Sequence, residues 1–194
     1  MILFDPDQPE SAEGFPQFSK SDGTRRAALP TVPTLRRSLR QAQEAAGVRG
    51  EVTVLLTTDD GIRRLNRLFR KKNKATDVLS FPSVNMMDAP DFEPGGDLAI
   101  SVETAARQAA EQGHALAVEL RVLMLHGLLH LSGMDHETDR GEMAALELKL
   151  REKFGLPAGL IERVEGQPEK QIPFGNDSKK GKSKAKGVTA GSAR

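Results

Sequence analysis

Residues 116–133 read LAVELRVLMLHGLLHLSG, and this stretch decides the fold. Apolar side chains lie on nearly every side of the helix that it predicts. A helix that is apolar all round is buried inside a protein or a membrane. No stretch of the chain approaches the roughly 20 apolar residues that a membrane helix needs. We therefore expect a helix in the middle of the domain.

The segments around this helix predict a small sheet and further helices. Short apolar or β-branched runs indicate strands at 1–4, 51–58, 76–82 and 97–101. Helices are expected at 34–48, 59–74, 102–113 and 137–155. Ile62, Leu65 and Phe69 should share one buried face of the second helix, and Met143, Leu146 and Leu150 should point inward from the last. The fold class is α+β: a small mixed β-sheet of about four strands packs against the central buried helix, with several surrounding helices.

The chain of 194 residues suits one domain with some loose ends. We expect a single domain over residues 1–165, with a flexible insertion at about 8–28 where Pro, Gly, Ser and acidic residues occur without periodicity. The loop at 83–96 is long enough to line or cover a cleft. Residues 166–194 form a basic tail without a packable pattern, and we expect that tail to be disordered.

The composition excludes several kinds of site. There is no cysteine, which excludes disulfides and thiolate metal sites, so any metal needs histidine or carboxylate ligands. The 28 basic residues balance 27 acidic ones, and net charge favours no class of partner. Without Trp or Tyr, the chain is poorer in aromatic residues than proteins that stack single-stranded bases. No segment resembles a signal peptide, so we expect a cytoplasmic protein.

Residues 126–136 read HGLLHLSGMDH and contain three of the four histidines. His126 and His130 are four residues apart and share one face of the helix. Gly133 permits the left-handed conformation that ends a helix, so the chain can turn and bring His136 to the same point. A lone buried histidine is usually a hydrogen-bonded core residue, but packing hardly explains three at this spacing. The central helix is therefore predicted to bind a metal, whereas His114 lies outside the pattern and is expected at the surface.

Three imidazoles leave one coordination position open, which is the catalytic arrangement for zinc. Imidazole also suits Ni²⁺, Cu²⁺ and Fe²⁺. The spacing is that of zinc proteases, HExxHxxGxxH, but Gly127 occupies the position of the glutamate that takes the proton from the metal-bound water. Peptide hydrolysis by that route is disfavoured. Asp135 could orient the adjacent ligand or cap the next helix, and both interpretations stay open. Asp77 and Asp97 are weaker candidates, expected as strand-end or turn residues.

The segment 63–74 reads RRLNRLFRKKNK, with seven basic residues and no acidic one. On a helix, Arg63, Arg67, Arg70 and Lys74 would lie close together. Charge runs of this kind are often only a solvated helix face. The alternative is a phosphate-binding surface that attracts nucleic acid regardless of its sequence. The planar guanidinium also suits a phosphate in a transition state better than a lysine does.

With both regions in view, the sequence resembles the YbeY family of bacterial endoribonucleases, the rRNA maturation factors. The matching stretches are HGLLHLSGMDH, LNRLFRKKNKATDVLSFP, GDLAIS and EMAALE. Their order and spacing also match, so the resemblance covers roughly residues 50–153. Ser132, Met134 and Asn73 depart from the family pattern, and we expect none of them to touch a predicted ligand.

The resemblance implies a metal-dependent, single-strand-specific endoribonuclease that acts in 16S rRNA 3′-end maturation and ribosome quality control. His126, His130 and His136 would bind one Zn²⁺ ion, with another divalent metal as an alternative. Arg70 would face the cleft and stabilise charge on the scissile phosphate, with Asp135 as a second candidate catalytic residue.

The nucleophile is either a zinc-bound hydroxide or the RNA 2′-hydroxyl, and the sequence does not decide between them. The implied partners are single-stranded RNA, the 16S rRNA precursor and the small ribosomal subunit, with neither DNA nor a membrane expected. Two other functions stay open: a zinc metalloprotease-like hydrolase, and a non-catalytic ribosome-binding or RNA-binding protein with a structural zinc.

Overall fold

A computed structural model of the protein describes residues 1–5, 29–83, 93–136 and 138–157. The elements are β1 (Ile2–Phe4), α1 (Val32–Ala46), β2 (Val52–Thr57), α2 (Asp59–Arg70), β3 (Val78–Pro82), β4 (Gly96–Ser101), α3 (Val102–Glu111), α4 (Leu116–Leu131) and α5 (Glu142–Phe154). The predicted insertion at 8–28, the tail at 166–194 and the middle of the predicted cleft loop, 84–92, lie outside the described residues.

The four strands form one mixed sheet in the order β1-β2-β4-β3. β1, β2 and β4 are parallel, and β3 pairs antiparallel with β4 at the edge. Because side chains alternate along a strand, each strand serves two faces. Leu98 and Ile100 of β4 pack in the main core, whereas Ala99 between them packs on the other face. The predicted α+β fold with a mixed sheet of about four strands is confirmed.

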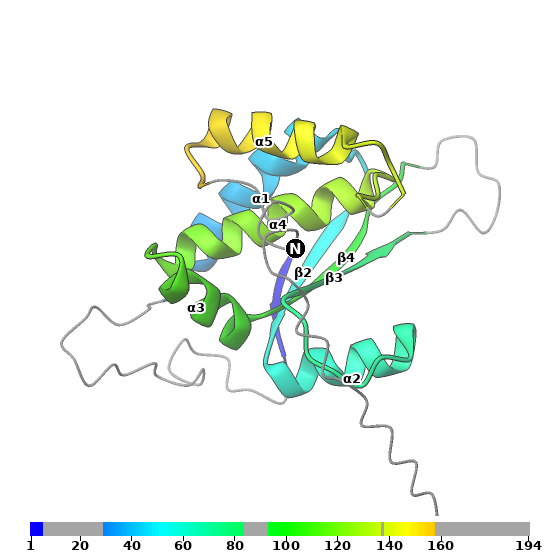
Figure 1. Ribbon diagram of the computed structural model, residues 1–194, viewed down its shortest axis with the longest axis vertical. Coiled ribbons are helices and arrows are strands. Elements are labelled where there is room, and N and C mark those ends of the chain that lie inside the picture. Colours follow the sequence, from blue (N-terminus) through cyan, green and yellow to red (C-terminus); the bar gives the residue numbers. More distant parts are fainter. Residues whose placement is uncertain (6–28, 84–92, 137, 158–194) are drawn as a thin grey trace, which may run out of the picture.

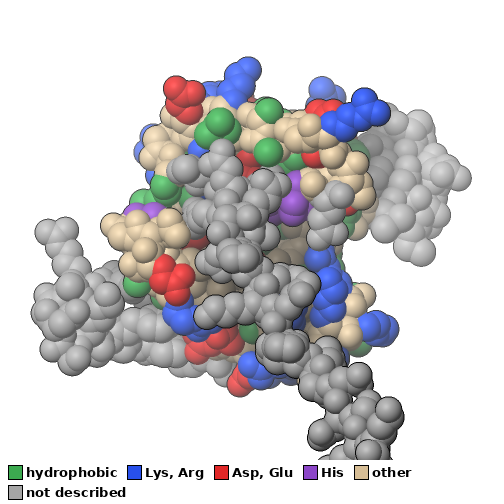
Figure 2. Space-filling view, in the orientation of Figure 1, with side chains coloured by type: hydrophobic (Ala, Val, Ile, Leu, Met, Phe, Trp, Pro, Cys, Tyr) green, Lys and Arg blue, Asp and Glu red, His purple; other side chains and the backbone are tan. Residues whose placement is uncertain are grey.

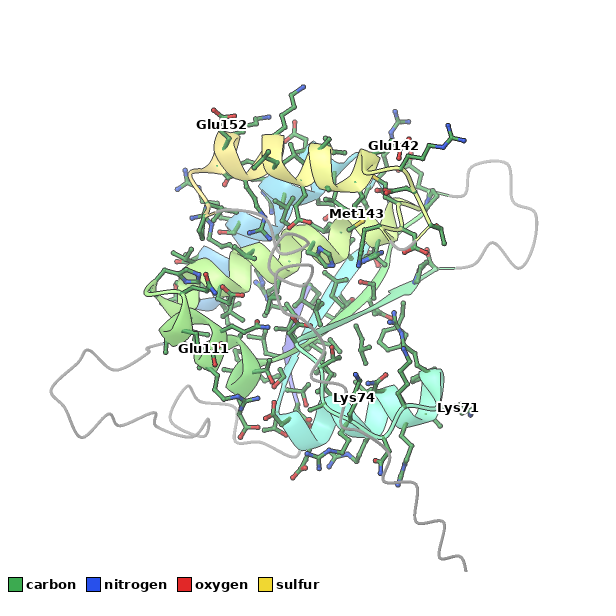
Figure 3. All side chains as sticks on the ribbon, in the orientation of Figure 1. Lys71, Lys74, Glu111, Glu142, Met143 and Glu152 are labelled. Atoms are coloured by element: carbon green, nitrogen blue, oxygen red, sulfur yellow. The ribbon has the colours of Figure 1, made fainter. Side chains whose placement is uncertain are left out.

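α4 lies across the main-core face of the sheet, with α1 and α5 beside it (Figure 1). Twelve of its sixteen residues are buried, which confirms that the apolar stretch forms the central helix. Met143 and Leu150 of α5 are buried in the same core, and Leu146 is half-buried against it. Figure 3 shows Met143 pointing from α5 toward α4, whereas Glu152 points away from the core.

α2 covers the opposite face of the sheet, where the fully buried Ile62 packs with Leu79 and Ala99 (Figure 1). The expectation that Phe69 shares this buried face is wrong, because its side chain is 59% exposed. At that point α2 meets only the edge of the sheet, and the Phe69 ring makes an edge contact with Phe81 of β3, with centroids 5.0 Å apart.

α2 also ends at Arg70, earlier than the predicted residue 74. Lys71 adopts a left-handed conformation with φ of 59°, and its N–H donates to the Asn66 carbonyl oxygen. The buried Asn66 side chain donates from Nδ2 to the Lys74 carbonyl oxygen at 2.8 Å. Asn66 therefore stops the helix and holds the basic loop that follows it.

No single helix in the described part of the chain is long and apolar enough to cross a membrane. Only α3 and α4 taken together meet the criteria of length and composition, and they are bent by 113° at the break between them.

Candidate metal centre

The structure brings His126, His130 and His136 together. Their candidate ligand atoms all lie within 4.8 Å of one another, and no other such cluster occurs among the described residues. The first two histidines belong to α4. His136 returns because the helix ends in a Schellman motif, with Gly133 at φ of 91°. The Gly133 N–H donates to the His130 carbonyl at 3.0 Å, and the Met134 N–H to the Leu129 carbonyl at 3.1 Å. The predicted turn at Gly133 is confirmed.

The outer ring nitrogens of the two helical histidines are held by acceptors. His126 Nδ1 lies 3.0 Å from a carboxylate oxygen of Glu147, and His130 Nδ1 lies 3.0 Å from the Met134 carbonyl oxygen. Because these oxygens accept, both contacts favour a ring with its proton on Nδ1, which leaves Nε2 with a free lone pair. His136 Nδ1 is buried and has no hydrogen-bond partner among the residues that the structure describes. Converging imidazoles with two lone pairs oriented in this way fit a divalent metal ion of the zinc type.

The pKa of His130 is lowered from its ordinary value of 6.5. Burial is the main cause, and the positive charges that His126 and His136 would carry add to it. The hydrogen bond to Met134 and the negative charge of Asp135 act in the opposite direction. The ring is therefore neutral at neutral pH, which is the form that binds a metal.

Gly127, which occupies the position of the protease glutamate, faces the sheet. A Cβ atom at this position would lie 2.8 Å from Leu98 Cδ2 and 3.3 Å from Ser80 Oγ. The Ser80 hydroxyl also donates to the Gly127 carbonyl oxygen at 3.3 Å, so helix and sheet touch directly here. A side chain at this position would require Leu98 to shift as α4 and the sheet are packed.

Sequence reasoning missed Glu147, the carboxylate that contacts His126. It lies on α5 with its side chain only 1% exposed, and the equally buried Arg151 donates from Nε to its Oε1 at 2.8 Å. One signal was available. Glu147 lies four residues after Met143 on the inward face of α5, where an apolar residue is expected.

Asp135 is half-buried in the loop between the second and third histidines. Its carboxylate accepts a hydrogen bond from Thr138 Oγ1 at 3.3 Å. Asp139, not Asp135, accepts from the first turn of α5, through the Met143 N–H at 2.8 Å. Of the two interpretations of Asp135, the capping one is therefore wrong, and its catalytic role stays a prediction.

Arg70 is the exposed last residue of α2. The edge strand β3 packs against both α2 and α4, so it lies between Arg70's helix and the histidine helix. Lys71 and Lys74 follow Arg70 at the end of α2 (Figure 3). Figure 2 shows histidine surface near the middle of the molecule and, below it on the same face, basic side chains over α2. The role of Arg70 stays a prediction.

The remaining candidates lie outside the histidine cluster. The expectation that His114 lies at the surface is wrong, because its side chain is only 14% exposed. Its Nε2 lies 2.9 Å from the buried Glu119 carboxylate. Asp77 precedes β3 and accepts from the Val78 N–H at 2.7 Å, as expected for a strand end. Asp97 is exposed within β4.

Comparison with known proteins decides the family. The family model described as Endoribonuclease YbeY matches residues 24–155, which contain the whole histidine cluster and α2. The chain belongs to the YbeY family. The predicted family is thereby confirmed, and with it the class of enzyme, a metal-dependent RNA hydrolase.

Three curated YbeY relatives, each named Endoribonuclease YbeY, show the extent of the match. The protein from Solibacter usitatus is 49% identical over 151 residues, which cover 77% of this chain and 97% of the relative. The protein from Koribacter versatilis is 56% identical over 126 residues, covering 65% and 79%. The protein from Nautilia profundicola is 50% identical over 115 residues, covering 59% and 80%.

Proposed function

We propose that this chain is a zinc-dependent endoribonuclease that cleaves single-stranded RNA in the cytoplasm. Its proposed role is 16S rRNA 3′-end maturation and ribosome quality control, with the rRNA precursor and the small ribosomal subunit as partners. The observation that carries the proposal is the convergence of three histidines in a member of the YbeY family. The proposed catalytic domain comprises residues 1–165, with the basic tail 166–194 outside it.

In this proposal His126, His130 and His136 hold one zinc ion. His126 and His130 bind it through Nε2, because their Nδ1 atoms are occupied by Glu147 and by the Met134 carbonyl. Bound zinc supplies a Lewis acid that stabilises negative charge on a phosphoryl oxygen and lowers the pKa of a coordinated water. The described part of the chain supplies three ligands, which leaves room for that oxygen, whereas a structural zinc site has four protein ligands.

Arg70 is the residue that we propose to face the scissile phosphate. A guanidinium keeps its charge at all working pH values and can donate two parallel hydrogen bonds to phosphate oxygens. Arg70 lies at the point where the Asn66 carbonyl and side chain fix the chain that leaves α2. Arg63 on the same helix is instead paired with Asp60 at 2.6 Å. Together with the position that the family resemblance implies, these contacts support Arg70 as the phosphate-binding residue.

Asp135 is proposed to orient its neighbour His136. Its negative charge acts on the His130 ring, which places it beside the cluster. The Thr138 hydroxyl and the N–H groups of Thr138 and Asp139 hold its side chain and carbonyl within a tight turn. Such a turn fixes the direction in which the next residue projects.

A cleavage assay on matched substrates tests the proposal. The zinc-loaded protein is incubated with one RNA oligonucleotide as a single strand, with the same RNA in a duplex, with the equivalent DNA, and with casein. We expect cleavage of the single-stranded RNA alone. Cleavage of casein would support the protease alternative, and tight RNA binding without turnover would support the non-catalytic one; either result overturns the proposal.

A further inference from the structure

Two charged side chains of α5 lie inside the protein beside the histidine cluster. Glu147 and Arg151 are each 1% exposed. Arg151 donates from Nε to Glu147 Oε1 at 2.8 Å and also contacts that oxygen through Nη2. Its Nη1 donates to the Pro157 carbonyl oxygen at 3.1 Å. The other oxygen of Glu147, Oε2, lies 3.0 Å from His126 Nδ1.

Removing two charges from water costs more free energy than a surface ion pair contributes. Stability alone therefore does not account for this buried pair. Arginine does not lose its proton in proteins, and its N–H groups only donate. Glu147 Oε1 therefore accepts from Arg151, and Glu147 Oε2 is left to accept from the imidazole. Each contact in the chain from Arg151 to Glu147 to His126 has one possible direction.

We propose that Glu147 is a positioning residue that fixes the tautomer of His126, and that Arg151 in turn fixes Glu147. The proton is held on Nδ1, so Nε2 presents its lone pair to the metal. The proposal rests on the proposed metal site, and it extends that site to α5, which carries none of the three histidines. A carboxylate behind a metal-bound histidine also makes the ring a better ligand.

Glu147→Gln tests the idea with almost no change in shape. Arg151 only donates and takes the single oxygen of the amide, so the amide NH₂ turns toward His126. The NH₂ group donates a hydrogen bond, and His126 accepts this bond when its Nδ1 carries no proton. The proton then sits on Nε2, the atom that would bind the metal. The substitution therefore favours the wrong tautomer, in addition to removing a charge.

The measurement is the zinc dissociation constant, obtained by competition with a chromophoric chelator. We expect Glu147→Gln to weaken zinc binding about 10- to 100-fold. Glu152→Gln is the matched control, since Glu152 is exposed on the same helix, and it should leave the constant unchanged. Thermal unfolding of the metal-free proteins shows whether each variant is folded. A folded Glu147→Gln protein that binds zinc as tightly as the wild type overturns the proposal.

A double variant distinguishes the tautomer from a general loss of charge. Glu147→Gln/Arg151→Met removes the guanidinium that donates to the amide oxygen. The amide can then rotate, so that its oxygen accepts a hydrogen bond from His126 Nδ1. We expect this variant to bind zinc more tightly than Glu147→Gln alone, although it carries one more substitution. Binding that is weaker still would contradict the proposed role of Arg151.

The wild-type protein offers a test that needs no variant. Nitrogen-15 NMR of the metal-free protein distinguishes the two neutral tautomers of a histidine ring. We expect His126 in the Nδ1–H form, and an Nε2–H form would overturn the proposal. The outcomes separate from those of the proposed function: a wild-type protein that binds no zinc refutes the metal site itself, whereas zinc binding with the wrong tautomer refutes only this inference.

Discussion

Gly127→Ala should destabilise the protein, although alanine is the better helix former. Alanine gains about 1 kcal/mol over glycine inside a helix. Here the added Cβ would lie 2.8 Å from Leu98 Cδ2 and 3.2 Å from Leu98 Cδ1. Leu98 is fully buried in the main core and has little room to move. Overpacking of this kind costs about 1–3 kcal/mol, so we expect a net loss of about 1 kcal/mol in the free energy of unfolding.

Urea denaturation of the metal-free proteins measures this loss. The matched background is Leu98→Val, which removes both Cδ atoms that the new methyl group meets. In that background only the contact with Ser80 Oγ at 3.3 Å remains, and the helix preference of alanine should make Gly127→Ala neutral or stabilising. The reasoning fails if Gly127→Ala stabilises the wild type. It also fails if the loss is the same in both backgrounds to within about 0.5 kcal/mol, the usual scatter for independent sites.

Three further results are expected. Arg70→Ala should lower the rate of RNA cleavage about 10²- to 10³-fold at unchanged zinc content, because it removes a group that stabilises charge in the transition state. Arg63→Ala, the control, should change the rate far less. Equal losses in the two variants would contradict the role of Arg70. Lys71→Gly should raise the free energy of unfolding by about 0.5–1 kcal/mol in urea denaturation, because a φ of 59° strains lysine but not glycine. A free energy of unfolding below that of the wild type would show that no strain is present. The folded state lowers the pKa of His130 below its ordinary value of 6.5. The metal-free protein should therefore be most stable above pH 6.5 and should lose stability as the pH falls through the lowered pKa. His130→Gln should flatten this pH dependence of stability, and an equally steep profile would mean that other groups cause the dependence.

The sequence predicted the elements whose patterns are local. The apolar stretch at 116–133 became α4, and the glycine at its end became the left-handed residue of the turn. The spacing of the three histidines was sufficient to predict that they converge, because helix geometry and one turn determine it.

What the sequence could not predict depends on contacts between distant segments. Phe69 fits the inward periodicity of α2, but the position of the sheet edge leaves it exposed. Glu147 is 21 residues from His126 in sequence, and only the packing of α5 on α4 brings them within 3.0 Å. In the sequence, Gly127 stands where a protease has its catalytic base. In the structure, it lies where Leu98 of β4 packs closely against α4. Charge patterns gave no sign that α2 and α4 cover opposite faces of the sheet.

Cleavage of single-stranded RNA as a function of zinc occupancy tests the central claim most directly. The protein is stripped with a chelator, zinc is added back in steps, and bound zinc and the initial rate of cleavage are measured on the same samples. We predict that the rate rises in proportion to occupancy and saturates at one zinc per chain, and that His130→Ala neither binds the ion nor cleaves. Full cleavage by protein that holds no metal would contradict the claim that the three histidines form the active centre.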